Sequence, residues 1–187
     1  MIFSQFPKSA AAARMLGDGF LPSMLVETPG GWRAVGALVA GDRLVTADHG
    51  ALPLVAVERS FRPAAGAWAM RLPAAALGNR DAAHLVPGQL VLVADAAALP
   101  HCGASRALVP ALALEGWRGV EPHVPLFPEA PVLLRLTRAA LIHAGPGLWL
   151  ACAGSMAQPV AADPNAPPEL CLSAARRLVA ALIGQAA

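Results

Sequence analysis

The stretch "GFLPSMLVETPGGWRAVGALVAGDRLVTADHG", residues 19–50, contains short apolar segments separated by turn residues. Within it, "TPGGW" sets Pro29 ahead of two glycines, a combination that favours a tight turn. Its end, "ADHG", places Asp48 and Gly50 where a hairpin reverses. The following "LPLVAVERSF" partly alternates apolar and polar residues, as a strand with one buried face does. This part of the chain is therefore predicted to form antiparallel strands.

The same pattern of short apolar runs and turns extends along the whole chain, which has 17 glycines and 18 prolines in 187 residues. Such a distribution is typical of many short strands joined by turns. We therefore predict a mainly β fold in one compact domain, since the length is sufficient for one substantial core. The predicted strands are Met24–Glu27, Trp32–Val35, Arg43–Thr46, Leu52–Phe61, Trp68–Leu72, Gln89–Ala94, Arg106–Val109, Val132–Thr137 and Leu148–Cys152.

One helix is predicted, at the C-terminal end. Pro168 is suited to a first helical turn, and Glu169 complements the helix dipole there. Apolar residues then recur at every fourth position and give the segment Pro168–Ile183 one apolar face. We expect this helix to dock on the β body, and a handle for a partner protein is the alternative. The apolar residues are Leu170, Ala174, Leu178 and Leu182.

The predicted organisation has four parts. Residues 1–17 are an N-terminal leader without an assigned role, and residues 18–156 are the β domain. Residues 157–167 are a linker rich in proline and alanine, and residues 168–187 contain the C-terminal helix.

Charge and hydropathy argue against two classes of partner. The formal net charge is +2 and no basic cluster exceeds the pair Arg176–Arg177, so nucleic acid is not an expected partner. The charge-free run over residues 139–162 is long enough to cross a bilayer, but "GPG" at 145–147 and Pro159 break any spanning helix. We expect buried strands and turns in this run, and no membrane partner.

The remaining composition concerns location and metal binding. Lys8 and Arg14 interrupt the stretch where a secretory signal needs an apolar block, which predicts a cytoplasmic protein, with secretion by another route as the alternative. An odd number of cysteines without paired spacing predicts reduced thiols. His101 and Cys102 are adjacent, but neighbours on an extended chain point in opposite directions, so neither a metal nor a cofactor is predicted. The cysteines are Cys102, Cys152 and Cys171.

The order of elements in residues 19–50 resembles the first signature of the hedgehog/intein (Hint) domain family, and it is closest to a bacterial branch common in alphaproteobacteria. The shared elements are an aromatic-x-Pro start at Phe20, the Thr-Pro-x-Gly turn, and a Gly-Asp reversal at Gly41–Asp42 that leads into "RLVT". The resemblance covers roughly residues 18–155. It implies a compact, horseshoe-shaped fold of curved antiparallel strands. Alternation and family position together place in the core Leu25, Val35, Leu44, Val55, Val57, Leu92, Val109, Leu134 and Leu136.

The catalytic motifs of the family are degenerate in this sequence. In active members a Cys precedes the aromatic residue, and a Thr/Ser-x-x-His signature assists proton transfer. The resemblance puts Gly19 at the Cys position, Val86 at the hydroxyl position and Gln89 at the His position. His84 lies too early in the motif and is interpreted as a structural or surface residue. Ser23, the nearest hydroxyl after the vacant position, is interpreted as a turn or strand-start residue.

Self-cleavage begins when a thiol or hydroxyl attacks the preceding carbonyl with the help of a nearby base. Glycine supplies no nucleophile, and a glutamine amide cannot shuttle protons near neutral pH. Active relatives also carry a histidine in the closing strands, and inteins end on an asparagine. This chain has His143 in "LIHAGPGLWL" but no His-Asn dipeptide. Because cooperating catalytic residues are strongly non-additive, losing several of them leaves little activity.

The sequence therefore predicts a catalytically silent Hint-like domain that acts as a scaffold or binding module, with an unidentified protein as its partner. Two alternatives stay open. One is an active autoprocessing domain whose nucleophile lies elsewhere in the chain. The other is a structural or assembly protein that makes its contacts through the β body and the C-terminal helix.

Overall fold

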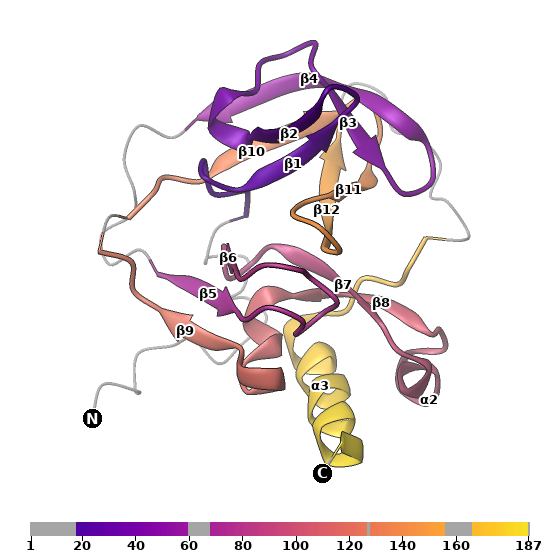
Figure 1. The fold of residues 1–187 in the computed structure, drawn as a ribbon. Coiled ribbons are helices and arrows are strands. Elements are labelled where there is room, and N and C mark those ends of the chain that lie inside the picture. Colours follow the sequence, from indigo (N-terminus) through magenta and orange to yellow (C-terminus); the bar gives the residue numbers. More distant parts are fainter. Residues whose placement is uncertain (1–17, 60–67, 127, 156–165, 187) are drawn as a thin grey trace.

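The computed structural model describes residues 18–59, 68–126, 128–155 and 166–186. Within these ranges twelve strands form three sheets, and the longest helix, α3, lies at the C-terminal end (Figure 1). The prediction of a mainly β fold with a C-terminal helix is thus confirmed. The predicted leader and most of the predicted linker lie outside the described residues, so these boundaries remain predictions.

The first sheet is an antiparallel hairpin of β1 (Leu25–Thr28) and β2 (Gly31–Ala34). Its turn is the predicted Thr-Pro-Gly-Gly segment. The hydroxyl of Thr28 donates a hydrogen bond to the carbonyl of Gly31 at 2.7 Å and accepts one from the amide of Gly30 at 3.2 Å. A threonine side chain that bonds the neighbouring backbone in this way holds a turn in one conformation.

The largest sheet has seven strands in the order β10-β4-β3-β11-β12-β7-β8. Neighbours in this order are antiparallel, and one additional pairing, between β10 and β12, is parallel. Strand β12 joins the two halves of the molecule, because it pairs with β11 above it and with β7 below it (Figure 1). The strands are β3 (Arg43–Thr46), β4 (Gly50–Arg59), β7 (Leu90–Ala94), β8 (Arg106–Pro110), β10 (Val132–Leu136), β11 (Ala140–His143) and β12 (Trp149–Gly154).

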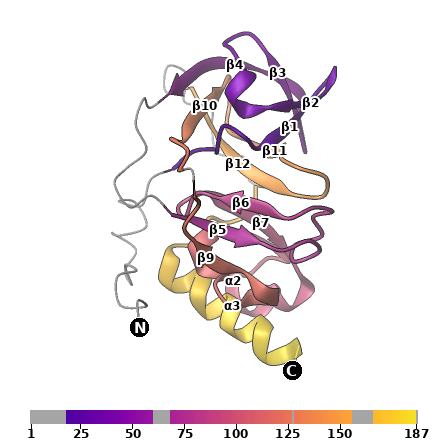
Figure 2. The same cartoon turned by 60° about the vertical axis from the view of Figure 1, so that its left-hand side comes forward.

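The third sheet lies in the lower half of the molecule and has the order β6-β5-β9 (Figure 2). It consists of β5 (Ala69–Leu72), β6 (Ala83–Leu85) and β9 (Glu121–His123). The sequence pattern did not predict β6, β9 or β11. The first two have only three residues each and contain a histidine, so they are too short and too polar to show a period of two.

The short helices lie mostly beside this lower half and support α3. They are η1 (Val35–Ala37), η2 (Ala96–Ala98), α2 (Leu99–Cys102), η3 (Ala111–Leu114) and η4 (Trp117–Gly119). Helix α3 (Leu172–Ala186) packs on η3, β8 and η2. Its buried face follows the helical period but differs from the predicted face, because Ala174 and Leu170 are only half-buried. The buried residues are Leu172, Ala175, Leu178, Val179 and Leu182.

The start of α3 differs from the prediction of Pro168. The amide of Leu108 in β8 donates to the carbonyl of Pro168 at 2.9 Å, and the amide of Leu170 donates to the carbonyl of Leu108 at 2.9 Å. Residues 168–170 therefore run alongside β8, and their backbone groups are not available for a helical turn. The helix instead begins at Leu172 and ends three residues later than predicted.

A single hydrophobic core connects the strands, α3 and the short helices. Of the predicted core residues, Val57 and Leu92 are half-buried, whereas Leu25 and Val55 are 47% and 43% exposed, so their inward placement is wrong. In β1 the buried positions are Val26 and Thr28, one residue out of step with the prediction. The predicted core residues that are buried are Val35, Leu44, Val109, Leu134 and Leu136.

Val55 points outward because the pairing of β4 with β10 is irregular at this point. Arg135 pairs with Ala56, whereas Leu136 pairs with Leu54, so Val55 is the extra residue of a β-bulge. A bulge shifts the alternation of the strand on one side of it. Sequence alternation alone could not reveal this, because the bulge depends on the partner strand.

The Gly41–Asp42 reversal before β3 has the expected tight geometry. Gly41 has a φ of +95°, a conformation that favours glycine. One carboxylate oxygen of Asp42 accepts from the amide of Val39 at 2.8 Å, and the other accepts from the guanidinium of Arg33 at 2.9 Å. The amide of Val39 and the charge of Arg33 hold the pKa of Asp42 below its ordinary value. The reversal is thus fixed by an ionised carboxylate.

The charge-free run at 139–162 was expected to form strands and turns, and its described part does form the two strands β11 and β12. Residues 156–162 lie outside the described part. Among the described helices, none has the length and apolar character needed to cross a membrane.

Candidate functional site

Gly19 lies at the beginning of the fold, next to β10. The adjacent Phe20 and Val132 exchange two backbone hydrogen bonds, at 2.9 and 2.8 Å. Gly19 has a φ of +122°, and a Cβ atom at this position would lie 3.0 Å from the carbonyl oxygen of Val132 and 3.2 Å from the Cβ atom of Pro131. A side chain therefore fits here only if the backbone moves. Glycine at this position is required by the present backbone and is not merely a small residue.

Gln89 lies at the start of β7 and is only 1% exposed. Its side-chain nitrogen donates to the carbonyl oxygen of Ala151 in β12 at 2.8 Å and to the carbonyl oxygen of the adjacent Leu90 at 3.2 Å. An amide nitrogen has two hydrogens, and both are used in these contacts. The two carbonyl partners also fix which end of the amide is nitrogen, since an oxygen facing them would be repelled. The Oε1 atom has no hydrogen-bond partner among the described residues.

The third motif position, Val86, is 4% exposed and belongs to the buried interior. Its carbonyl oxygen accepts from the amide of Gln89 at 2.9 Å, which closes the turn that leads into β7. The side chain supplies no polar group to the site. The structure thus places Val86 in a turn beside Gln89, in a packing role.

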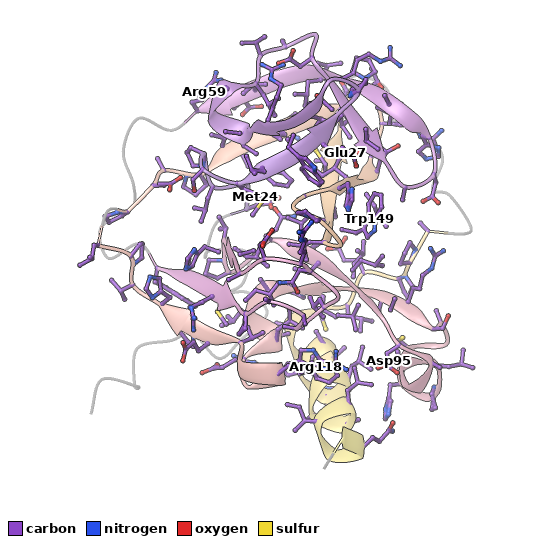
Figure 3. The ribbon with its side chains drawn as sticks, in the orientation of Figure 1. Met24, Glu27, Arg59, Asp95, Arg118 and Trp149 are labelled. Carbon is purple, nitrogen blue, oxygen red and sulfur yellow. The ribbon has the colours of Figure 1, made fainter. Side chains whose placement is uncertain are left out.

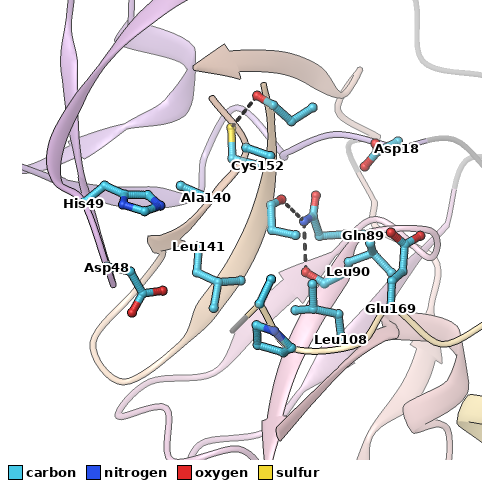
Figure 4. A pocket seen from close by; sticks show the side chains of 15 residues that line it. Asp18, Asp48, His49, Gln89, Leu90, Leu108, Ala140, Leu141, Cys152 and Glu169 are labelled. Atoms are coloured by element: carbon cyan, nitrogen blue, oxygen red, sulfur yellow. Dashed lines mark hydrogen bonds between the residues drawn. The ribbon is translucent and has the colours of Figure 1, made fainter. Parts of the chain in front are cut away.

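A cavity of about 360 Å³ lies between β11, β12 and the start of β7, and Gln89 is the motif position that lines it (Figure 4). Asp18, the residue before Gly19, lines one side, and Gln89 lines another. The residue before Gly19 and the residue at the histidine position of the motif thus line the same cavity. The apolar part of its wall includes Leu90, Leu108 and Leu141.

The charged residues of the cavity were not predicted as site residues. Asp18, Asp48 and Glu169 bring three carboxylates to its wall together with the imidazole of His49, and no lysine or arginine lines the described part of it. Asp48 and Glu169 come from a hairpin turn and from the segment before α3, which are far apart in sequence. Only the pairing of residues 168–170 with β8 brings Glu169 here, and no local pattern signals that pairing.

Cys152 also lines this cavity, but it is a poor nucleophile. Its thiol donates to the carbonyl oxygen of Leu134 at 3.4 Å and is 2% exposed as a residue. Burial, and then the negative charge of Asp18, raises the pKa of Cys152 to about 12. At neutral pH the group is therefore the unreactive thiol and not the thiolate.

His84 and Ser23 lie away from this site, on the wall of a second cavity of about 280 Å³. His84 is exposed, as predicted for a surface residue, and Ser23 lies in the turn before β1, as predicted for a turn residue. The ring of His84 lies 5.0 Å from that of His123. Partial burial, and then the charges of His123 and Arg71, lowers the pKa of His84.

His143 in β11 is held on both sides of its ring. Its Nδ1 atom lies 2.5 Å from a carboxylate oxygen of Glu27, and its Nε2 atom accepts from the amide of Gly147 at 3.0 Å. Trp149 stacks on it with 4.5 Å between ring centroids; Figure 3 labels both Glu27 and Trp149. The lone pair that a general base needs is occupied by a backbone amide, so His143 is a structural residue in this arrangement.

His101 and Cys102 lie on α2, so the expectation that they occupy an extended segment is wrong. The thiol of Cys102 donates to the carbonyl oxygen of Ala98 at 3.3 Å, as a helical residue can. In the parts of the chain that the structure describes, no three histidine, cysteine, aspartate or glutamate side chains are grouped closely enough to hold a metal ion.

The model of the Hint domain family matches residues 19–144, which is more than half of the chain. The protein therefore belongs to the Hint domain family. No curated protein matches the sequence significantly. Among solved structures, the chain is similar to the MchDnaB-1 intein, with 14% identity and a TM-score of 0.45 over 71% of this chain and 98% of the intein chain. A variant of that intein is similar with 15% identity and a TM-score of 0.44, over the same shares of both chains.

Proposed function

We propose that this Hint domain does not cleave itself and that it works as a binding module. The observation that carries the proposal is the geometry of Gly19. An acyl shift needs a nucleophilic side chain at this position. Glycine has none, and the carbonyl of Val132 and the ring of Pro131 fill the space that a side chain would need. The position is therefore adapted to a glycine.

Gln89 supports the same conclusion. In a cleaving domain the residue at this position would donate a hydrogen bond to the scissile amide or move a proton. Both hydrogens of its side-chain nitrogen are instead held by the carbonyls of Ala151 and Leu90. Its free atom, Oε1, is an acceptor that does not ionise. It cannot serve as a general acid or base near neutral pH.

What remains of the site favours binding. The cavity beside Asp18 and Gln89 has about 360 Å³, which falls in the range of small-molecule pockets, and its wall is apolar with a few polar groups. The Gly41–Asp42 reversal and the core are intact, so the scaffold that shapes this cavity is kept. On the motif order we also place the protein in the bacterial branch of the family, as a cytoplasmic pseudoenzyme.

The direct test is the mass of the intact protein. The purified full-length chain is incubated with and without a strong thiol at neutral pH, and its mass is followed over days by mass spectrometry. We expect the mass of the full chain throughout, since no nucleophile is present at residue 19. A fragment that begins at Gly19 would show that the domain is an active autoprocessing protein. Light scattering after size exclusion tests the assembly alternative, for which a stable oligomer is expected.

A repair experiment tests the assignment of the site. Gly19→Cys, Val86→Thr and Gln89→His are combined in one chain, and thiol-dependent release of residues 1–18 is sought by mass spectrometry. Release would indicate that Gly19 occupies a vacated nucleophile position. The single variant Gly19→Cys is the matched control and is expected to stay intact, because it lacks a proton-transfer group. A folded but inert triple variant would count against this alignment of the motif.

A further inference from the structure

We propose that the cavity between Asp18 and Gln89 binds a small organic ammonium ion, of the alkylamine or alkyldiamine class. The proposal rests on the binding role proposed above and names the chemical class of the ligand. Three features of the cavity lead to it, and they are independent of one another. They are an unpaired acceptor in its wall, the sign of its charges, and the apolar surface between those charges (Figure 4).

The unpaired acceptor is the Oε1 atom of Gln89. The residue is 1% exposed, and within the described structure this atom has no hydrogen-bond partner. Leaving a buried acceptor unpaired is destabilising, so native proteins almost always satisfy such groups. The nitrogen of the same amide is held by Ala151 and Leu90, so the amide cannot rotate to pair its oxygen elsewhere. The group that completes this site must donate a hydrogen bond.

The charges of the wall select a cation among the possible donors. The carboxylates of Asp18, Asp48 and Glu169 line the cavity, and no lysine or arginine accompanies them in the described lining. Walls of one sign concentrate ions of the opposite sign in a cleft. An anion such as a carboxylate would be repelled. A metal ion is also disfavoured, because no three of the described acidic, histidine or cysteine side chains are close enough to coordinate one.

The apolar surface indicates that the cation is organic. Leu90, Leu108 and Leu141 lie between the charged groups, together with several alanines of β11 and β12. A fully hydrated inorganic cation gains nothing from such a surface, whereas an alkyl chain is removed from water there. The volume of about 360 Å³ is near the lower limit for ligand pockets, which suits a short amine. An ammonium group has three hydrogens to donate, which matches a wall that offers carboxylates and an unpaired acceptor.

The test is a calorimetric titration of the full-length chain with 1,4-diaminobutane and with n-butylamine. Butan-1-ol and butyrate serve as ligands of similar size without charge and with the opposite charge. We expect saturable binding of the amines at low salt, weaker binding at high salt because the carboxylates are screened, and little binding of the other two. Nα-acetyl-lysine amide, which keeps the side-chain ammonium ion of lysine, tests whether the bound ammonium group comes from a protein side chain or from a free amine.

Variants locate the binding. The double variant Asp48→Asn/Glu169→Gln is expected to weaken amine binding about fivefold, since each exposed charge pair contributes only modestly. Glu115→Gln, at an exposed carboxylate outside the cavity, is the matched control and should bind amines like the unchanged chain. Gln89→Met removes the acceptor. Its amine affinity is compared with that of the unchanged chain, once its melting temperature has confirmed that it folds.

Three results would overturn the proposal. These are no saturable amine binding, equal binding of butanol and butylamine, or unaltered affinity in the double variant. The intact mass is measured on the same samples, so failure of this proposal is distinct from failure of the proposed function. A cleaved chain contradicts the silent domain, whereas an intact chain that does not bind amines contradicts only the ligand.

Discussion

At the scale of single residues, position 19 combines two properties that are separable in principle. It lacks a nucleophile because it is glycine, and it has a φ of +122° beside the carbonyl oxygen of Val132. The first property is visible in the sequence. The second shows that restoring a cysteine changes the backbone as well as the chemistry, since L-residues rarely adopt this conformation.

We predict that Gly19→Cys lowers the free energy of unfolding by about 1–3 kcal/mol, the usual cost of holding a non-glycine residue in a sparsely populated conformation. Urea denaturation measures the change. Gly30→Cys is the matched control, because a Cβ atom there meets only the hydroxyl of Thr28, at 3.8 Å, and the residue is exposed. It should alter the stability by less than about 0.5 kcal/mol. Equal effects of the two variants would show that Gly19 is not conformationally required.

Cys171 differs from the buried Cys152 in its surroundings and in its expected reactivity. It is exposed and precedes α3, where its thiol lies 3.3 Å from the hydroxyl of Ser173. That hydroxyl, and then the backbone amide of Ala174, holds the pKa of Cys171 below its ordinary value.

We predict that iodoacetamide alkylates Cys171 first and leaves Cys152 unmodified in the native protein. A lowered pKa leaves more thiolate at neutral pH. The alkylation rate of Cys171 should therefore begin to fall at a lower pH than the rate of an ordinary cysteine does. Peptide mass spectrometry over a pH series follows both sites. Ser173→Ala should shift the pH profile of Cys171 upward. An unshifted profile would contradict the role of the hydroxyl.

At the scale of elements, strand register decides which apolar residues form the core. Leu44 in β3 is fully buried, whereas Leu25 in β1 is 47% exposed, although both were expected inward. The two strands are of similar length and composition. Their difference arises from the register of the strands, because the buried positions of β1 are Val26 and Thr28 and Leu25 therefore falls on its outward face.

We predict that Leu44→Ala lowers the free energy of unfolding by about 2–5 kcal/mol, the range for truncating a fully buried leucine. Leu25→Ala makes the same chemical change at an exposed site and should cost about 0.5 kcal/mol or less. Thermal and urea denaturation measure both. If Leu44→Ala were as mild as Leu25→Ala, the placement of β3 in the core would be wrong.

At the scale of the whole molecule, β12 holds the two halves together, and Cys152 lies within it. The chain has no tyrosine and its only lysine is Lys8, so few groups besides cysteines titrate between pH 8 and 11. The pKa of Cys152 is raised from an ordinary value of 9.0 to about 12 in the folded state. Folding and the ionisation of this thiol therefore oppose each other.

The sign follows from proton binding. Above pH 9 the unfolded chain loses the Cys152 proton while the folded chain keeps it, so stability is complete below pH 9 and declines up to about pH 12. We predict a loss of up to about 1.4 kcal/mol per pH unit in this window. Urea denaturation under reducing conditions from pH 8 to 10.5 measures it.

Cys152→Ala should remove most of this alkaline slope, although it lowers the stability at every pH by truncating a buried side chain. Cys171→Ala, at an exposed thiol, is the control and should keep the slope. A slope that persists unchanged in Cys152→Ala would assign the alkaline loss of stability to another group.

The sequence by itself determined the mainly β class, the C-terminal helix and the order of turns in residues 19–50. Turns depend on the local chemistry of glycine, proline, aspartate and threonine, which any reader of the sequence can recognise. The vacancy at Gly19 and the replacement at Gln89 are also properties of the sequence, because a missing side chain is missing in every fold.

Only the tertiary structure decided what surrounds those two positions. The unpaired oxygen of Gln89 depends on the carbonyl of Ala151 in β12, and the exposure of Val55 depends on a bulge against β10. The cavity gathers Asp48 and Glu169 from distant segments, the latter because the residues before α3 pair with β8. These contacts are non-local, and a local sequence pattern carries no information about which strand will lie alongside another.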